Sequence, residues 1–373
     1  MKLLYTNFHD GDGGGHTTYI RTLAGALAGR HEVHVAAPAG SRLVREARSL
    51  KGVRVWEQPF PNGLNRLAAR ARARAQLKDC LVDEKFDIVH VNGSADHRLV
   101  LSVVRHLSRK PRVVLTKHNS KPIRGLGHWW RARHTDQVIA VCDYTYRALS
   151  QTAYRRCALA TVPNGIDTHY YAPQREVADG SWYASGDWRK PDALLLGSTS
   201  GTAAYKGWMD LIEALALLPA SLRGQIHLLI AGRLPETSFR ERIAALKLTD
   251  QIHFAGLMTD VRPAIAAMDV GFVLSWDVET ISFACREMMA MGKPVVVTEY
   301  AGLPENIRPG LDGWCVPPRD TMAMATLLEQ LLEQRDALPA MGQQARRHAE
   351  QSFGLQRFVD GTERVYRDLL QHN

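Results

Sequence analysis

The stretch Asp269-Val-Gly-Phe-Val-Leu-Ser275, followed by Trp276-Asp-Val-Glu-Thr-Ile-Ser-Phe-Ala-Cys-Arg-Glu287, joins a continuously apolar run to a polar segment and the start of a helix. A run that is apolar without alternation is typical of a strand buried on both faces, as in parallel sheets covered by helices. The polar segment then lies at the carboxyl edge of the sheet, where such sheets bind ligands. This stretch therefore predicts a doubly wound α/β fold.

The same alternation of apolar strands and helices extends over nearly the whole chain. In the first half we expect strands at Lys2–Thr6, Glu32–Ala36, Val53–Trp56, Asp87–Val91, Arg112–Thr116, Gln137–Val141 and Leu159–Val162. In the second half we expect them at Ala193–Gly197, Ile226–Ala231, Gln251–Ala255, Asp269–Ser275 and Pro294–Thr298, with helices alone over Thr321–Leu370. The strandless stretch Ala172–Pro191 lies between the halves. The pattern predicts two domains, residues 1–170 and 171–355.

Composition excludes several classes of protein. The 373 residues are 45% hydrophobic and 23% charged, which is typical of a globular protein and not of a disordered or fibrous one. No run approaches the roughly 18 apolar residues of a spanning helix, and the first residues do not resemble a signal peptide. Five scattered cysteines without a C-x-x-C pair predict neither a disulfide framework nor a structural zinc site. We therefore expect a cytoplasmic protein.

The charge is unevenly distributed, because residues up to Tyr170 contain 27 Lys and Arg against 13 Asp and Glu, and the remainder contains 20 against 25. The excess of positive charge in the first part suggests an anionic partner: nucleic acid, a phospholipid surface or a phosphorylated acceptor. A predicted helix over Leu64–Leu81 carries cations at every fourth residue, on a side separate from Leu64, Leu67, Ala71, Ala75 and Leu77. A short loop mixes aromatic and basic residues. These two groups are Arg66, Arg70, Arg74 and Lys78, and Trp129, Trp130 and Arg131.

Such cations are often simply solvated, but their combination with tryptophans favours peripheral contact with an anionic membrane. The hypothesis is that the first domain rests on the cytoplasmic face of the inner membrane and receives a lipid-linked acceptor. A nucleic-acid partner is not expected, since the mixture of aromatic and basic residues is confined to one loop.

Two features suggest a site for a phosphorylated sugar. Glu279 and Glu287 lie eight residues apart around a helix start, so they could bind separate hydroxyl groups, although glutamates on a helix are usually solvated. The run Gly11-Asp-Gly-Gly-Gly-His16 follows the first strand, where backbone N–H groups approach an anion or simply form a tight turn. Thr17 or Thr18 is expected to cap the next helix, Thr17–Gly29.

These motifs together resemble the GT-B glycosyltransferases, in particular the large retaining family 4, which includes lipopolysaccharide-core glucosyltransferases. The resemblance covers the second half nearly end to end. Its motifs there are Gly197, Lys206-Gly207, Leu229–Gly232, Ile252–Gly256, the E-x7-E pair Glu279 and Glu287, Met291–Val296, Gly302–Glu305 and Gly313–Pro318. The first half matches more loosely, at Gly13–Gly15, Asp87–His90, Lys117–Asn119 and Val162–Asp167.

The resemblance implies two Rossmann-like domains facing across a cleft, with a C-terminal helix, residues 356–373, that returns to the first domain. It implies a catalytic set of His118, Glu279 and Lys206, in which Lys206 holds the diphosphate and Glu279 a hydroxyl of the donor sugar. Glu287 would hold the ribose. The implied donor-binding set is Gly14, Gly15, Lys206, Arg233, Glu279, Ile281, Ser282, Phe283 and Glu287.

The chain departs from the family pattern at two places. Ser198 stands where many relatives have an arginine, so Arg233 is a candidate replacement. Thr280, Ile281 and Ser282 stand where many relatives have glycines, which leaves backbone N–H contacts possible but restricts close approach. We expect no essential metal or other cofactor, because Glu279 belongs to the E-x7-E register and not to a D-x-D motif.

The sequence therefore predicts a retaining hexosyltransferase that uses a UDP-sugar, UDP-glucose above others, and a lipopolysaccharide-core or similar cell-envelope glycolipid acceptor. A nucleotide-sugar epimerase of the same fold is the nearest alternative. An NAD-dependent oxidoreductase is a more distant one, since it lacks a convincing G-x-G-x-x-G with an acidic partner.

Overall fold

The computed structural model describes residues 1–11, 14–63, 66–173, 190 and 192–371 as two compact units. The first unit comprises Met1–Asn164 and Gln356–Asn373, and the second comprises Gly165–Leu355. The chain thus enters the second unit before Tyr170, where the sequence analysis placed the boundary. Most of the expected boundary stretch, residues 174–189 and 191, lies outside the described residues.

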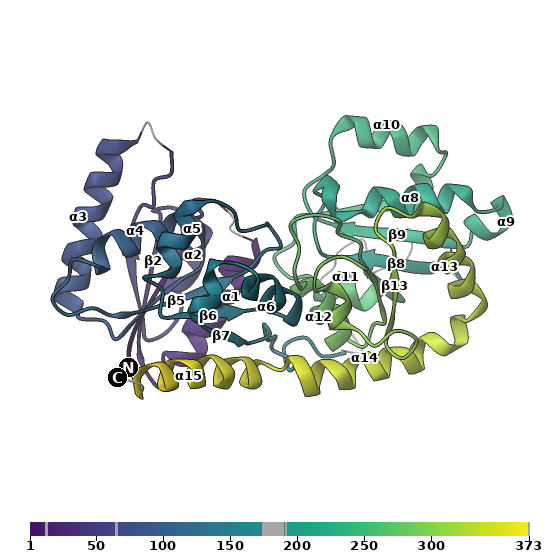
Figure 1. The fold of residues 1–373 in the computed structure, drawn as a ribbon. Coiled ribbons are helices and arrows are strands. Elements are labelled where there is room, and N and C mark those ends of the chain that lie inside the picture. The colour runs from purple at the N-terminus through teal and green to yellow at the C-terminus, as the bar shows by residue number, and fades with distance from the viewer. Residues whose placement is uncertain (12–13, 64–65, 174–189, 191, 372–373) are drawn as a thin grey trace. The chain divides into compact units, whose positions relative to one another are not determined.

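The described part of the first unit contains a seven-stranded parallel sheet of order β3-β2-β1-β4-β5-β6-β7 (Figure 1). Its chain order reverses between β1 and β4, which pair from Leu3 with Ile88 to Thr6 with Val91. The strands are β1 (Lys2–Thr6), β2 (Glu32–Ala37), β3 (Val53–Glu57), β4 (Ile88–Val91), β5 (Arg112–Lys117), β6 (Gln137–Ala140) and β7 (Ala158–Thr161).

Helices cover both faces of this sheet. Leu4, Val89 and Val113 face α3 and α4 in one hydrophobic cluster, while Tyr5 on the other face hydrogen-bonds to Tyr366 of the last helix at 3.0 Å. The helices are α1 (Gly14–Leu27), α2 (Arg42–Arg48), α3 (Leu67–Glu84), α4 (Ser94–Val104), α5 (Leu126–Ala132), α6 (Asp143–Ser150), η1 (Ala153–Arg156) and α15 (Leu355–Gln371).

The described part of the second unit contains a six-stranded parallel sheet of order β10-β9-β8-β11-β12-β13, so its chain order reverses between β8 and β11. One face packs on α8, α10 and α13, and the other on α11, α12 and α14 (Figure 1). The strands are β8 (Leu194–Ser198), β9 (Ile226–Ala231), β10 (Ile252–Gly256), β11 (Val270–Val273), β12 (Val295–Thr298) and β13 (Gly313–Val316). The α-helices are α8 (Trp208–Leu217), α9 (Ala220–Arg223), α10 (Thr237–Ala245), α11 (Arg262–Ala267), α12 (Phe283–Ala290), α13 (Thr321–Glu333) and α14 (Leu338–Phe353). Short 3-10 turns are η2 (Ala204–Lys206), η3 (Thr249–Gln251), η4 (Leu303–Asn306) and η5 (Arg335–Ala337).

The structure confirms the doubly wound α/β class and corrects local details. The apolar pattern of the sequence did not predict β13, an edge strand whose middle residues are only partly buried. Thr17 and Thr18 do not cap α1, because the helix already begins at Gly14. No helix within the described residues is long and apolar enough to span a bilayer.

Candidate active site

The switch point of the second sheet brings together the loops that follow β8 and β11, as expected for a ligand site in this topology. After β8 the chain reaches the 3-10 turn Ala204–Lys206 and then Gly207, whose φ is +70°. A Cβ on Gly207 would lie 2.0 Å from the carbonyl oxygen of Leu274, just past β11. Only glycine fits there, and this close contact places Lys206 beside the segment that carries Glu279.

Lys206 and Glu279 form an ion pair, with Nζ 2.6 Å from Oε2. Their side chains are only 16% and 14% exposed, so the pair is shielded from water and stronger than a typical surface pair. The Ser275 hydroxyl lies 3.4 Å from the same carboxylate oxygen. The structure thus brings together two members of the predicted catalytic set, which lie 73 residues apart in the chain.

Glu287 occupies a different environment on α12. Ser282 caps this helix, since its hydroxyl accepts a hydrogen bond from the Cys285 N–H at 3.3 Å. Burial raises the pKa of Glu287 to about 7, and the hydroxyl of Tyr171, which donates a hydrogen bond to the carboxylate, opposes that rise. Burial together with this carboxylate raises the pKa of Tyr171 as well. The two glutamates therefore have separate partners, a cation for Glu279 and a phenol for Glu287.

The neighbouring predicted donor residues differ in burial and in their contacts within the protein. Ile281 is buried in the core and Phe283 packs against it, so their side chains are structural. Arg233 follows Gly232 after β9, with an exposed side chain, and its carbonyl oxygen accepts a hydrogen bond from Thr202 at 2.5 Å. Ser198 is buried and its hydroxyl lies 2.8 Å from that of Ser200, so no cation stands at that strand end.

The switch point of the first sheet carries histidines. His118 follows β5, and its Nε2 lies 2.8 Å from the side-chain oxygen of Asn92 after β4. Its ring packs on His16, with centroids 4.4 Å apart, and burial holds the pKa of His118 well below its usual value. Gly14 and Gly15 begin α1 and are exposed, with Gly14 at a φ of +49°. Residues 12–13 of the predicted glycine loop lie outside the described residues.

Lys117, directly before His118, is a further cation that the sequence analysis did not assign. Burial lowers the pKa of its ammonium group to about 8. The group donates hydrogen bonds to the Asn119 side chain at 2.5 Å and to the Lys121 carbonyl at 3.0 Å.

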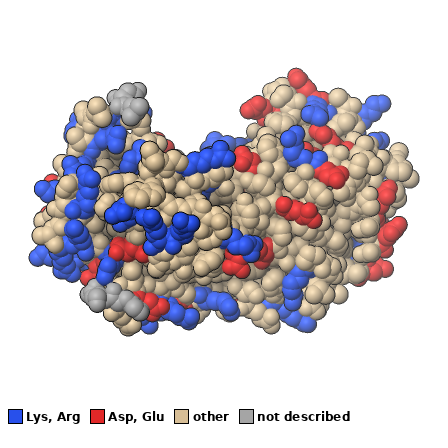
Figure 2. Space-filling model, viewed as in Figure 1, with Lys and Arg blue, Asp and Glu red and all other residues tan. Residues whose placement is uncertain are grey.

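The predicted basic surfaces are only partly as expected. Figure 2 shows Lys and Arg side chains gathered over the visible face of the first unit around α3, α4 and α5. On α3, however, the buried residues are Ala73, Leu77, Cys80 and Leu81, whereas Leu67, Ala71 and Ala75 of the predicted apolar side are exposed. Leu64 lies outside the described residues.

Three of the four predicted cations are exposed and one is partly buried. Because each step of four residues turns about 40° around a helix, the row winds gradually around α3. Arg70 is half-buried, and Arg74 donates to the Ser102 carbonyl at 3.1 Å. Arg66 precedes the first helical residue, and Lys78 is exposed.

On α5 the prediction for Arg131 is wrong, since Arg131 is 7% exposed and hydrogen-bonds to Tyr154. Trp130 is also partly buried, against the core of the first unit. Trp129 is 46% exposed, and the guanidinium groups of Arg133 and Arg156 each lie 5.1 Å from its ring centroid.

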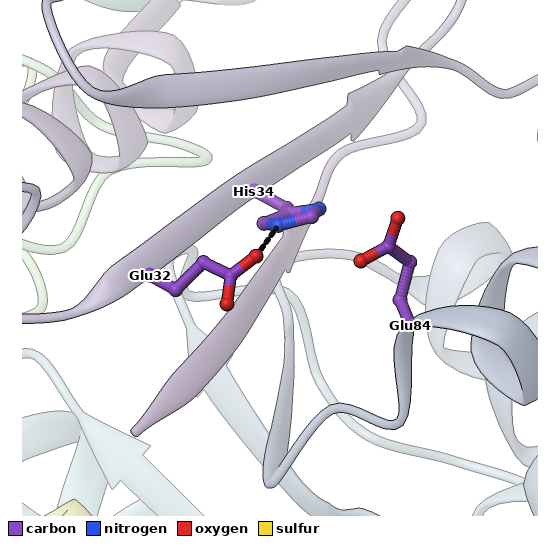
Figure 3. A group of neighbouring side chains, drawn as sticks. All are labelled: Glu32, His34 and Glu84. Atoms are coloured by element: carbon purple, nitrogen blue, oxygen red, sulfur yellow. Dashed lines mark hydrogen bonds and ion pairs between the residues drawn. The ribbon is translucent and has the colours of Figure 1, made fainter.

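One other cluster has side chains that bind metals in proteins, namely Glu32 and His34 on β2 and Glu84 at the end of α3 (Figure 3). The ammonium group of Lys2 already pairs with both carboxylates, and His34 Nδ1 accepts a hydrogen bond from the Trp56 indole at 2.8 Å. The guanidinium group of Arg54 lies 3.3 Å from the Glu32 carboxylate and 3.8 Å from that of Glu84, so two cations balance the two carboxylates.

Comparison with known proteins identifies the family. Residues 13–170 match the family described as Glycosyltransferase Family 4, and residues 190–334 match that described as Glycosyl transferases group 1. The chain belongs to the family 4 glycosyltransferases. Its two Rossmann-like units are those of the GT-B fold, and the chain is an enzyme that transfers a glycosyl group.

Two solved structures share the fold over the full length. A glycosyltransferase from Rickettsia africae has a TM-score of 0.85 at 18% identity, covering 100% of this chain and 99% of that one. HepE from Anabaena, solved in complex with UDP-glucose, has a TM-score of 0.79 at 18% identity, covering 99% and 100%. A relative in Rhizobium meliloti, the lipopolysaccharide core biosynthesis glycosyltransferase LpsE, is 33% identical over 38% of this chain and 40% of its own length.

Sequence reasoning missed two residues near these sites. Tyr171 bonds to Glu287 from 116 positions upstream, and no spacing rule links such distant residues. His16 was visible only as the end of the glycine run, with nothing to show that its ring packs on His118.

Proposed function

We propose that this glycosyltransferase moves a hexose from a UDP-sugar, UDP-glucose above others, to a lipopolysaccharide-core or similar cell-envelope glycolipid, with retention of anomeric configuration. The observation that carries the proposal is the shielded ion pair between Lys206 and Glu279 at the switch point of the second sheet. HepE, which shares the fold and binds UDP-glucose, supports the donor. The partial similarity to LpsE supports the acceptor class.

The chemistry assigns opposite tasks to the two members of the pair. In the reaction the bond between the sugar C1 and the diphosphate oxygen breaks, and the acceptor oxygen forms a new bond to C1 while its proton passes to the departing diphosphate. Negative charge grows on the departing UDP, and a cation fixed beside it lowers the barrier. The Lys206 ammonium group would thus bind the diphosphate in place of the Glu279 carboxylate. The released carboxylate would accept a hydrogen bond from a hydroxyl of the donor sugar.

Glu287 would bind the same donor through hydrogen bonds to hydroxyl groups. Its half-buried carboxylate already accepts a hydrogen bond from the Tyr171 hydroxyl, so it is suited to neutral hydroxyl groups such as those of a ribose. A shielded carboxylate that binds a hydroxyl contributes more than an exposed one, because water competes less.

A thermal-shift screen of UDP-, GDP- and ADP-glucose and of UDP-galactose and GDP-mannose tests the donor. A ligand that binds only the folded protein raises the melting temperature by mass action. We expect the largest rise with UDP-glucose, and a smaller one in the Glu287→Ala variant. A larger rise with a GDP- or ADP-sugar contradicts the uridine assignment. Proton NMR of the product then reports whether the anomeric configuration is retained.

We further propose that the first unit contacts an anionic leaflet through the exposed face of α5. This surface comprises Leu126, which is 90% exposed, and Trp129 on α5. Arg133 directly after α5 and Arg156 at the end of η1 complete it. An exposed indole between two guanidinium groups has the composition of a residue at the level of lipid headgroups. Co-sedimentation with vesicles of phosphatidylglycerol and phosphatidylcholine tests this, and binding that does not depend on the anionic lipid or on salt contradicts it.

A further inference from the structure

A row of aromatic rings in contact with one another lies at the carboxyl end of β1. Phe8 packs on His9 with centroids 4.1 Å apart, and His9 meets His16 edge-on at 4.8 Å. His16 packs on His118 at 4.4 Å, and His118 meets Tyr19 at 4.5 Å. The first ring also rests on a glycine, since a Cβ on Gly93 would lie 2.2 Å from Phe8. The row is therefore held at both ends.

His16 is partly buried, and it differs from the buried histidines His90 and His97 of this unit in its hydrogen bonds. Within the described residues its Nδ1 is buried and has no hydrogen-bond partner, and the neighbouring Thr17 hydroxyl has none either. By contrast, both ring nitrogens of His90 are bonded, to Tyr366 and Thr116, and His97 bonds to Thr135. A buried polar atom without a partner is unfavourable. The pattern is typical of a group that receives its partner from a ligand.

The position of His16 also points to a ligand. His16 is the third residue of α1, a helix of 14 residues that starts at the switch point of the first sheet. The first N–H groups of such a helix have no partner within the helix. The free imidazole nitrogen, the free Thr17 hydroxyl and the helix start thus lie in adjacent residues at the sheet edge where this topology binds ligands.

The charge state of the row decides the class of ligand. Burial lowers the pKa of His16 to about 3, and it also lowers the pKa of His9 and His118. All three rings are therefore neutral near pH 7 and give no ionic attraction to a phosphate. The nearby cation, Lys117, is already hydrogen-bonded to the Asn119 side chain and the Lys121 carbonyl. A neutral imidazole nitrogen exchanges hydrogen bonds with hydroxyl groups, such as those of a sugar.

We propose that His16 binds a hydroxyl group of a neutral acceptor sugar through Nδ1, and that this contact makes His16 a specificity-determining residue for the acceptor. The inference rests on the proposed function, because it assumes glycosyl transfer from a donor bound by the second unit. It deepens that function by assigning the reacting end of the acceptor to an uncharged sugar, whatever charge the rest of the acceptor carries.

Three variants of the full-length enzyme separate hydrogen bonding from packing. His16→Phe keeps a ring but removes both nitrogens. His16→Asn places an amide near the position of Nδ1, whereas His16→Gln places it near the position of Nε2. The matched control is His134→Asn, because His134 is exposed and packs on Trp130 in the same unit, with centroids 4.9 Å apart.

The assay uses UDP-glucose and three neutral probes, the n-octyl glycosides of glucose, galactose and mannose. We expect His16→Phe to raise the acceptor KM for the preferred glycoside about tenfold, as for a lost hydrogen bond in a shielded site. His16→Asn should stay within about threefold of the wild type, and His16→Gln should resemble His16→Phe. The melting temperature should not fall in His16→Phe, since no hydrogen bond within the protein is lost.

Several outcomes overturn the inference. One is an unchanged acceptor KM in His16→Phe, and another is equal rescue by Asn and Gln. A third is a weakening of UDP-glucose binding, measured by calorimetry, that is as large as the rise in the acceptor KM. That result would assign His16 to the donor. A wild-type enzyme that binds UDP-glucose but transfers glucose to none of the three glycosides also overturns it and leaves the donor assignment intact. A wild-type enzyme that binds no nucleotide sugar instead contradicts the proposed function.

Discussion

The two sheets of this glycosyltransferase share the same strand order through six strands, yet their switch points differ in charge. The second presents an ion pair, Lys206 with Glu279, and the carboxylate of Glu287. The first presents the neutral rings of His9, His16 and His118. Its carboxylate, Asp96, accepts hydrogen bonds from Thr6 and Asn92. One topology thus supports a site with an ion pair and a second carboxylate, and a site lined mainly by neutral rings beside the cation Lys117. The difference suits a reaction that joins an anionic donor to a hydroxyl group.

The largest expected effect is on the loop that builds the charged site. Gly207→Ala places a Cβ 2.0 Å from the Leu274 carbonyl at a φ of +70°. We expect it to lower the free energy of unfolding by about 3 kcal/mol or more, and to abolish transfer by displacing Lys206. Gly256→Ala is the matched control, since its φ is +77° but nothing lies within 4 Å of the added Cβ. The control should lower that free energy by only about 1 kcal/mol. Urea unfolding measures both, and equal losses would argue against the close contact.

The charged site itself should depend on the cation. We expect Lys206→Ala to lower kcat by a factor of about 10² to 10³, the range for removing one group that stabilises a developing anion. Arg242→Ala removes the cation of a surface pair, 2.8 Å from Glu213 with the arginine 60% exposed, and should leave kcat unchanged. Initial rates at saturating UDP-glucose measure both. A Lys206 variant that loses donor affinity but keeps kcat would mean that the lysine binds substrate and transition state equally.

The sequence predicts the elements of these two sheets better than the contacts between residues that are distant in the chain. Continuous apolar runs located the central strands to within a few residues, because burial on both faces requires them to be apolar. The edge strand β13 was not predicted, since Trp314 and Cys315 are only partly buried. The spacing of Arg66, Arg70, Arg74 and Lys78 predicted a helix correctly but not which side of it is buried. The buried bond of Arg131 to Tyr154, like that of Tyr171 to Glu287, depends on tertiary contacts that no local pattern encodes.

A smaller effect should appear in the pH dependence of stability. The pKa of Glu287 is raised to about 7 from an ordinary value of 4.5. The folded protein therefore binds this proton more tightly than the unfolded chain does. The resulting stabilisation is complete below pH 4.5 and disappears as the pH rises towards 7. Glu287→Gln should remove this decline.

The difference between wild type and Glu287→Gln isolates this group, because Asp96, with its pKa raised to about 6 by burial, adds a decline of the same sign in both proteins. We expect the difference to change by on the order of 1 kcal/mol between pH 4.5 and 7.5 in urea unfolding of the ligand-free enzyme. Parallel curves for the two proteins would show that Glu287 ionises normally and that the charged site is more open to water than its burial indicates.

The smallest effect concerns the basic surface of the first unit. Arg156 packs over the exposed ring of Trp129, so its cation lies where a bilayer would contact α5. One basic residue near an anionic leaflet contributes about 1 kcal/mol, so Arg156→Ala should weaken vesicle binding about fivefold. Arg242→Ala, which removes the same charge from the second unit, should not weaken it. Equal losses in the two variants would mean that net charge, and not the face of α5, governs binding, and the membrane contact would then belong to neither unit in particular.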